Sequence, residues 1–171
     1  MSAILESLSS KLLLISKSKD FTLATAESCT AGLIGAWITH IPGSSSYFDR
    51  GFITYTNEAK EQMLGVLHES LQRHGAVSEE VARQMAKGAK SRANSTISVA
   101  VSGIAGPDGG TNLKPVGTVC VAFAIDNKVY SKTCHFTGDR AKVRESTVIE
   151  ALNGFINLLE GNDLQGYKVQ I

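Results

Sequence analysis

The sequence predicts an α/β fold, a three-layer α/β/α sandwich with a mixed β-sheet, formed by a single domain over residues 1–171. Short apolar runs typical of buried strands alternate with segments whose apolar residues recur at helical spacing. The last two apolar runs are joined by Asp126-Asn127-Lys128, which is typical of a hairpin and adds an antiparallel pair. A chain of 171 residues fits one domain and is too short for two ordinary ones.

Local patterns place each element along the chain. Asn57 can cap a helix that starts at Glu58, and Ser78 can cap a helix over 79–92, because both side chains accept hydrogen bonds from amides at a helix start. Between the helix that starts at Glu58 and His74, further short helical pieces are expected. The other helices are expected at 2–17, through 33–38 and at 140–159, and the strands at 22–25, 51–56, 96–102, 117–126 and 129–136. We expect a core over residues 5–160 and a loose tail over 161–171.

Composition narrows the classes of function. The formal net charge is +1 and aromatic residues make up 6% of the chain, so neither nucleic acid nor a membrane is an expected partner. The apolar run at 12–15 is too short to span a membrane. The three cysteines include no C-x-x-C pair, which argues against structural zinc and suits a reducing compartment. The histidines are dispersed in the sequence, so we expect no metal site. We also expect a cytoplasmic protein that uses no cofactor.

The segment 24–30 joins a strand to a helix and carries Ser28. Unpaired N–H groups and the positive end of the helix dipole gather at a helix start, where they favour an attacking oxygen and the oxyanion that follows. From this segment alone a simpler alternative stays open, in which Ser28 or Thr30 merely caps the helix. Cys29 is a rival nucleophile, since a helix start also lowers a thiol pKa, but no histidine motif adjoins it and a small buried residue is favoured.

A second segment, 54–60, ends a strand and opens a helix. Lys60 falls in the first turn of that helix, where the dipole and partial burial would lower its pKa toward that of a usable base. A serine–lysine pair needs a neutral amine of this kind beside the hydroxyl. Tyr55 stands at the end of the strand and could relay or orient a proton. The simpler alternatives are a solvated lysine and a half-buried tyrosine.

Two further segments are suited to binding an anion. Four glycines follow the strand at 96–102, and they allow the close backbone approach that a phosphate or an oxyanion requires, although a merely flexible loop fits as well. The pattern is neither a P-loop nor a dinucleotide fingerprint. Arg140 opens the last expected helix, where it could clamp a phosphate, with surface arginines beside a capped helix as the alternative.

Taken together, these motifs resemble those of a known family. The runs TAESCTAGLIGAWIT, IPGSSSYFDRGFITYTNEAK, HGAVSEEVA, VSGIAGPDGGTNLKPVGTV and FTGDR stand in the order seen in the C-terminal domain of competence-damage-inducible (CinA) proteins. The resemblance covers residues 5–160. Standalone members look like nicotinamide-nucleotide amidases, which convert nicotinamide mononucleotide and water to nicotinate mononucleotide and ammonia in pyridine nucleotide salvage. The resemblance also implies a homodimer.

The family resemblance assigns roles to particular residues. Ser28 matches the nucleophilic serine of the A-E-S-C-T motif, and Tyr55 and Lys60 match the tyrosine and the base of the T-Y-x-N-x-x-K motif. We expect the nucleotide substrate to be bound by residues of these motifs and of the glycine-rich loops, namely Glu27, Thr30, Gly43, Ser44, Ser45, Ser102, Gly103, Gly106, Gly109 and Arg140. Ala31 stands where many members have glycine, and we expect alanine to be tolerated there inside a helix.

The expected mechanism is acyl transfer to Ser28 with neutral Lys60 as the base. Backbone N–H groups near Ser28, together with the Ser102–Gly103 segment, would hold the oxyanion. The alternative is a non-catalytic nucleotide-binding module that senses a phosphorylated ligand for a partner. The presence of Lys60 and Tyr55 together with Ser28 argues against it, since binding alone does not need these three side chains.

Overall fold

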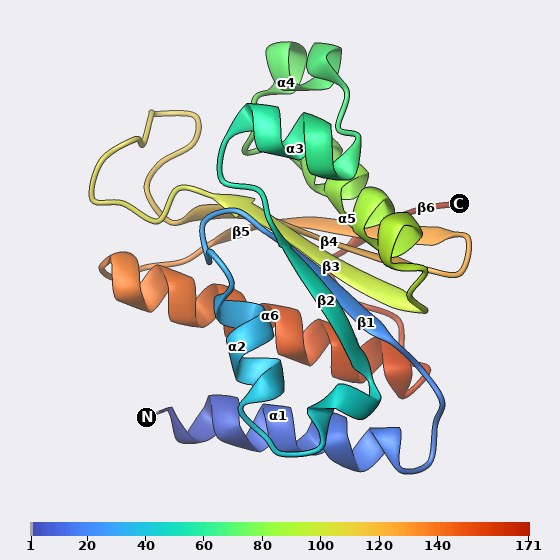
Figure 1. Cartoon of the computed structure of the whole chain (residues 1–171). Helices are drawn as coiled ribbons and strands as arrows, with labels where there is room; N and C mark the ends of the chain where they lie inside the picture. Colours follow the sequence, from blue (N-terminus) through green and yellow to red (C-terminus); the bar gives the residue numbers. More distant parts are fainter. Residues whose placement is uncertain (1) are drawn as a thin grey trace.

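The computed structural model describes residues 2–171 and contains one six-stranded mixed sheet (Figure 1). Its strands are β1 (Leu23–Glu27), β2 (Phe48–Ile53), β3 (Ile97–Gly103), β4 (Thr118–Ile125), β5 (Lys128–His135) and β6 (Lys168–Gln170), in the order β2-β1-β3-β4-β5-β6. The β1 strand pairs in parallel with β2 and β3, and the other neighbours are antiparallel. The carboxyl ends of β1, β2 and β3 therefore meet at one edge of the sheet.

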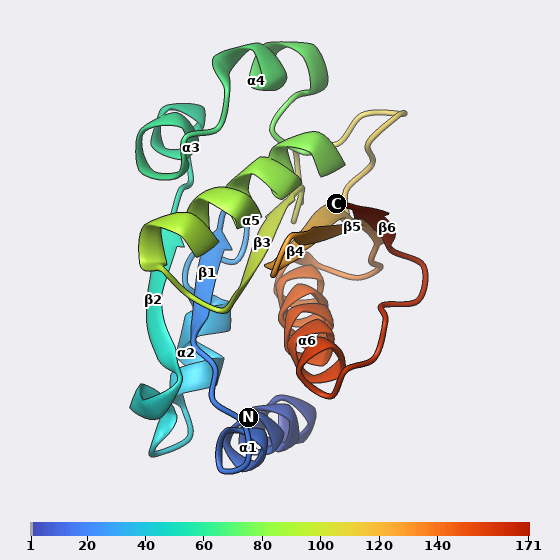
Figure 2. The ribbon, with the colours of Figure 1, turned by 90° about the vertical axis from the view of Figure 1, so that its right-hand side faces the viewer.

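Helices cover both faces of this sheet. One layer holds α1 (Ala3–Ser16), α2 (Leu33–Thr39) and α6 (Arg140–Leu159), and the other holds α3 (Asn57–Leu64), α4 (His68–His74) and α5 (Glu79–Ala93). A view turned by 90° shows the sheet between the two layers (Figure 2). The predicted three-layer α/β fold with a mixed sheet is thus confirmed. Among residues 2–171, no helix combines the length and the apolar character needed to cross a membrane.

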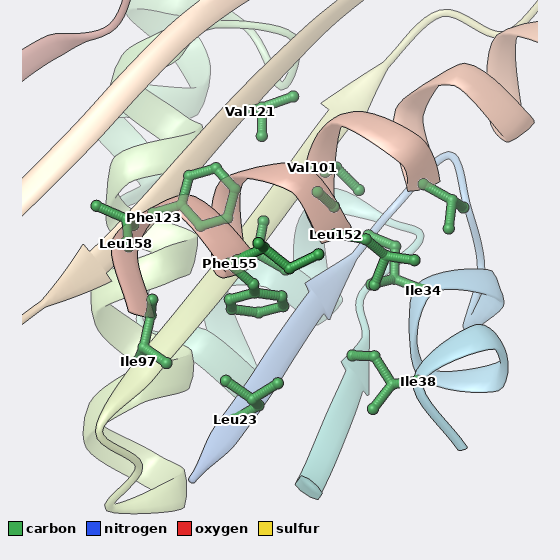
Figure 3. Packing of buried hydrophobic residues seen from close by; sticks show 14 of the residues in the cluster. Leu23, Ile34, Ile38, Ile97, Val101, Val121, Phe123, Leu152, Phe155 and Leu158 are labelled. Atoms are coloured by element: carbon green, nitrogen blue, oxygen red, sulfur yellow. The ribbon is translucent and has the colours of Figure 1, made fainter. Parts of the chain in front are cut away.

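The larger core lies between the sheet and α6, where side chains from β1, β3 and β4 meet those of α2 and α6 (Figure 3). Phe123 and Phe155 are fully buried there, with ring centroids 5.5 Å apart in an edge-to-face arrangement. A Cβ at Gly154 would lie 2.1 Å from the Phe123 ring, so only glycine allows this approach of α6 to β4. This packing holds α6 against the sheet, and the same helix carries Arg140 and Arg144 near its start.

A close approach on the other face seats α3. A Cβ at Gly88 of α5 would lie 2.0 Å from the carbonyl oxygen of Leu64, at the end of α3. Backbone can therefore rest on backbone at this point, which lets α3 and α5 pack closely. Since α3 carries Lys60, the missing side chain at position 88 helps set the depth at which that lysine enters the protein.

Two expectations about β2 and α3 were wrong. The strand predicted at 51–56 runs from Phe48 to Ile53, because parallel pairing with β1 matches Leu23 to Phe48 and Glu27 to Ile53. Thr56 rather than Asn57 caps α3, accepting a hydrogen bond from the Ala59 amide at 3.1 Å.

The tail is also more ordered than predicted, because β6 pairs with β5. The Tyr167 hydroxyl donates to Glu150 at 2.9 Å, which holds the approach to β6 against α6. The three residues of β6 are exposed, so no apolar alternation marks this strand in the sequence.

Candidate active site

The candidate site lies at the edge of the sheet where β1, β2 and β3 end. Ser28 follows β1 directly, and its amide donates to the carbonyl of Val101 on β3 at 3.1 Å. The side chain is 9% exposed. Gly32, in a left-handed conformation, is the N-cap of α2, so neither Ser28 nor Thr30 has the capping role that the sequence left open. The Ser28 hydroxyl is thus available for chemistry.

Lys60 reaches this hydroxyl from α3. Its Nζ lies 3.1 Å from Ser28 Oγ, 2.9 Å from the carbonyl oxygen of Thr54 and 3.4 Å from that of Tyr55. The side chain is 1% exposed, and burial lowers the pKa of the Lys60 amine below its usual value. Among residues 2–171, no carboxylate lies within ion-pair distance of Nζ. The structure therefore brings the predicted nucleophile and the predicted base into direct contact.

Tyr55 has a different place from the one that a proton relay to Ser28 would require. Its side chain is 58% exposed, and its hydroxyl accepts a hydrogen bond from Arg140 Nη2 at 3.3 Å. The contact with Lys60 is made by the backbone carbonyl. Arg140 also donates from Nη1 to the carbonyl of Gly106 at 2.9 Å, so this guanidinium links the start of α6 to the glycine-rich loop and to the segment between β2 and α3.

A cavity of about 220 Å³ opens over the Ser28–Lys60 pair. Tyr55, Arg140, Ser102 and Gly103 line it, as predicted for members of the site. Sequence reasoning missed four further lining residues, which are Asn57, Ala76, Val77 and Ala105. The run HGAVSEEVA, which contains two of them, was noted only for its family resemblance, because small apolar side chains carry no chemical signal.

Two residues predicted to bind substrate are buried parts of the framework. The Glu27 carboxylate accepts the hydroxyl of Thr30 at 2.6 Å and three amides at the start of α2. Glu27 is 1% exposed and Thr30 is fully buried, and neither lines the cavity. The two side chains therefore hydrogen-bond to each other, and the Glu27 carboxylate also accepts hydrogen bonds from the start of α2. The sequence motif alone does not reveal these contacts.

Four other predicted binding residues lie away from the cavity. Gly43, Ser44 and Ser45 precede β2, at the end of the sheet opposite the carboxyl ends (Figure 1). Their loop closes on α1, since a Cβ at Gly43 would lie 3.3 Å from Leu13. Gly109 is exposed on the long loop between β3 and β4, whereas Gly106 of the same loop touches Arg140.

Cys29 lines the cavity next to Ser28, but the residue is only 5% exposed, and burial raises the pKa of its thiol to about 11. A thiol with this pKa is almost wholly protonated at neutral pH and is a poor nucleophile. This agrees with the interpretation of Cys29 as a small buried residue. Within residues 2–171, no three His, Cys, Asp or Glu side chains are grouped so that they could hold a metal ion.

Ala31 departs from expectation, because it lies outside any helix and has a left-handed φ of 49°. Replacing Ala31 by glycine is expected to stabilise the protein by about 0.5–1 kcal/mol. The Cβ costs about 1–2 kcal/mol in this conformation, which exceeds the extra backbone entropy of glycine, about 0.5–1 kcal/mol. Thermal unfolding measures the difference. Ala36→Gly, in the interior of α2, is the matched control and should lower the Tm; a loss of stability in both variants would contradict the prediction.

The sequence matches the family model described as CinA C-terminal domain over residues 5–159. Nicotinamide-nucleotide amidohydrolase PncC of Escherichia coli (strain K12) is 51% identical over 138 residues, which cover 80% of this chain and 83% of that protein. The CinA-like protein of Chloroherpeton thalassium is 49% identical over 150 residues, which cover 85% of this chain and 36% of that protein. The chain thus spans about a third of the length of several longer relatives.

A solved structure agrees with the sequence relatives. The competence/damage inducible protein CihA from Agrobacterium tumefaciens superposes with a TM-score of 0.90 at 42% identity, covering 94% of this chain and 98% of that one. The family match covers the helices and strands except β6 and the first two residues of α1, and it includes every segment that meets at the candidate site. The chain therefore belongs to the CinA C-terminal domain family.

Proposed function

We propose that this protein hydrolyses the carboxamide of nicotinamide mononucleotide, giving nicotinate mononucleotide and ammonia. The observation that carries the proposal is the 3.1 Å contact between Ser28 Oγ and the buried Nζ of Lys60 at the floor of a small cavity. The amidohydrolase name of the relatives from E. coli and Pseudomonas putida supplies the substrate class.

Lys60 acts as the base in its neutral form. A neutral amine has two hydrogens and one lone pair, and the carbonyls of Thr54 and Tyr55 can accept both hydrogens. The lone pair then faces Ser28, whose hydroxyl donates to it. Ser28 Oγ attacks the amide carbon as its proton passes to Lys60, and ammonia leaves with that proton. Water hydrolyses the acyl-enzyme in the second half of the reaction, again through Lys60.

The oxyanion needs donors other than the amide of the nucleophile itself, because the Ser28 amide donates to Val101. We assign this role to the amides of Cys29 and Gly103, two residues that line the cavity. Gly103 must stay glycine, since a Cβ there would lie 2.6 Å from Val119 Cγ2 and 2.9 Å from the carbonyl of Thr118. The absence of a side chain also leaves the backbone open toward the substrate.

The size of the cavity suggests how the substrate lies. A volume of about 220 Å³ is below the roughly 300–1,000 Å³ of pockets that enclose whole drug-sized ligands. The pyridine ring and its amide fill this space, and the ribose phosphate stays at the rim. Arg140, which stands at the rim and at the start of α6, binds the phosphate there.

Replacing Arg140 by methionine is expected to raise KM for nicotinamide mononucleotide by about 10–100-fold, since hydrogen bonds to a charged group contribute about 1.5–3 kcal/mol. The kcat should change much less, because the phosphate is remote from the amide. Steady-state kinetics separates the two parameters. Arg140→Lys keeps the charge and should recover part of the loss, and an unchanged KM in Arg140→Met would refute a phosphate contact.

The direct test is to incubate the purified protein with nicotinamide mononucleotide and to follow ammonia release together with the nucleotide product by chromatography. Equal amounts of ammonia and nicotinate mononucleotide support the proposal, and free nicotinamide should react far more slowly because it lacks the phosphate. Binding of the nucleotide without any ammonia would instead support the alternative of a non-catalytic nucleotide-binding module.

We also propose that the protein is a homodimer and that it works in the reducing environment of the cytoplasm. Tyr55, Leu67 and Leu113 expose 58%, 61% and 92% of their surface, and Tyr55 also lines the cavity over Ser28. Association of two copies would cover such side chains. The three cysteines are free and buried, which suits a compartment that keeps thiols reduced.

A further inference from the structure

The segment that presents Ser28 has little internal support. We call residues 28–31 the nucleophile turn. Its own backbone hydrogen bonds are few, with the Ala31 amide donating to the Ser28 carbonyl at 3.1 Å and the Leu33 amide to the Thr30 carbonyl at 3.1 Å. It also contains the left-handed Ala31. A turn of this kind keeps its shape only if neighbouring groups hold it.

Glu27 holds the turn from one side. Its carboxylate accepts the Thr30 hydroxyl at 2.6 Å and the amides of Gly32, Ile34 and Gly35 at 2.9–3.0 Å. Among residues 2–171 this carboxylate forms no ion pair, and at 1% exposure it has almost no access to water. The charge is therefore stabilised by the start of α2 and by Thr30, which ties the turn to a helix end.

Arg144 holds the same turn from the other side. It lies one helical turn after Arg140 on α6 and donates from Nε to the carbonyl of Cys29 at 3.2 Å and from Nη2 to that of Thr30 at 2.9 Å. A planar guanidinium reaches the two carbonyls with N–H groups on two different nitrogens held in a fixed fork, a geometry that the single nitrogen of an ammonium lacks. Arg144 does not line the cavity over Ser28, so this geometry gives it no contact with substrate.

We propose that Glu27 and Arg144 are positioning residues that brace the nucleophile turn between opposite charges and thereby keep Ser28 Oγ at 3.1 Å from Lys60 Nζ. The carboxylate accepts hydrogen bonds from the turn and from the start of α2, and the guanidinium donates hydrogen bonds to carbonyls of the turn. Thr30 is bound by both, through its hydroxyl and its carbonyl. The inference rests on the proposed role of Ser28 as nucleophile.

The brace is tested with Thr30→Val, which removes the hydrogen bond between the turn and Glu27, and with Arg144→Met, which removes both hydrogen bonds of the guanidinium. A displacement of about 1 Å at a reacting atom costs on the order of 10²-fold in rate, so we expect kcat to fall by about 30–100-fold in each variant. The KM should stay within about twofold of wild type, because ground-state binding is untouched. The midpoint of the pH–rate profile should be the same as in the wild type, because Lys60 still sets it.

Conservative variants separate positioning from general damage. Thr30→Ser restores the hydroxyl and should recover most of kcat, whereas Arg144→Lys keeps the charge and should recover little. Lys142→Met is the matched control on α6, since Lys142 is exposed and pairs only with Glu145 among the residues described, and it should leave kcat unchanged. A higher KM with unchanged kcat in Arg144→Met would make Arg144 a binding residue and overturn the proposal.

A second readout does not depend on the substrate. An alkyl fluorophosphonate labels an activated serine as Oγ bonds to phosphorus, fluoride leaves and the hydroxyl proton passes to the base. Intact-mass spectrometry gives the labelling rate of Ser28, which should fall in Thr30→Val and Arg144→Met. Crystal structures of both variants should show Ser28 Oγ beyond hydrogen-bond distance from Lys60 Nζ. Labelling and distance both equal to wild type would overturn the brace, even if nicotinamide mononucleotide proves not to be the substrate.

Discussion

Replacement of Ser28 by alanine is expected to lower kcat for nicotinamide mononucleotide by on the order of 10⁶-fold, as for other serine nucleophiles that act with a base. The hydroxyl is the atom that bonds to the acyl group, and the thiol of the adjacent Cys29 cannot replace it, because burial keeps that thiol protonated. Ammonia release under saturating substrate measures the loss. KM or the dissociation constant should change little, since the cavity keeps its walls.

The fold of the Ser28→Ala variant should be intact, because among the described residues the Ser28 hydroxyl hydrogen-bonds only with Lys60 Nζ, and the hydrogen bond from the residue 28 amide to Val101 remains. Circular dichroism and thermal unfolding check this. Ser91→Ala, an exposed serine on α5, is the matched control. Near-native turnover by Ser28→Ala would end the nucleophile assignment.

Lys60→Met carries the second largest expected effect, a fall in kcat of about 10⁴-fold, the upper range for general base catalysis. The wild-type rate should rise with pH as the amine loses its proton, and burial places that rise below the usual 10.5 of a lysine pKa. The variant has no titrating base, so its residual rate should lack this rise. A pH–rate profile for both proteins decides, and an unchanged profile in Lys60→Met would assign the titration to another group.

Stability should respond to pH through the same group. The folded-state pKa of Lys60 is lowered, so the unfolded chain binds more protons between that value and 10.5. Stability of the wild type therefore rises with pH in this window, and below it the buried ammonium costs the fold its full penalty. Lys60→Met should lose this slope in Tm against pH, which is measurable without any substrate.

Much of the fold and the centre of the site could be predicted from the sequence, because local patterns determined them. Ser78 caps α5 as expected, and the hairpin of β4 and β5 forms where it was predicted, although its turn has two residues, Asp126 and Asn127, because Lys128 already pairs with Ile125. Parallel strand ends brought Ser28 and Lys60 together. The lowered pKa of Lys60 also followed from expected burial at a helix start.

Other parts depended on contacts between distant segments. Glu27 was predicted to bind substrate, but nothing in its motif indicates that the start of α2 folds back onto its carboxylate. The hydroxyl of Tyr55 is bound by Arg140, 85 residues away. The loop at 43–45 resembles an anion-binding loop in composition, yet the strand that follows carries it to the far end of the sheet.

The contact between Gly88 and Leu64 gives the chain a requirement that no list of catalytic residues contains. Any side chain larger than hydrogen at position 88 would push α3 outward, since its Cβ would overlap the carbonyl oxygen of Leu64. The amine of Lys60 would then retreat from the serine as part of a rigid body. Activity therefore depends on the close contact between α3 and α5. Position 88 on α5 takes no part in the chemistry, yet it should tolerate substitution as poorly as the catalytic residues do.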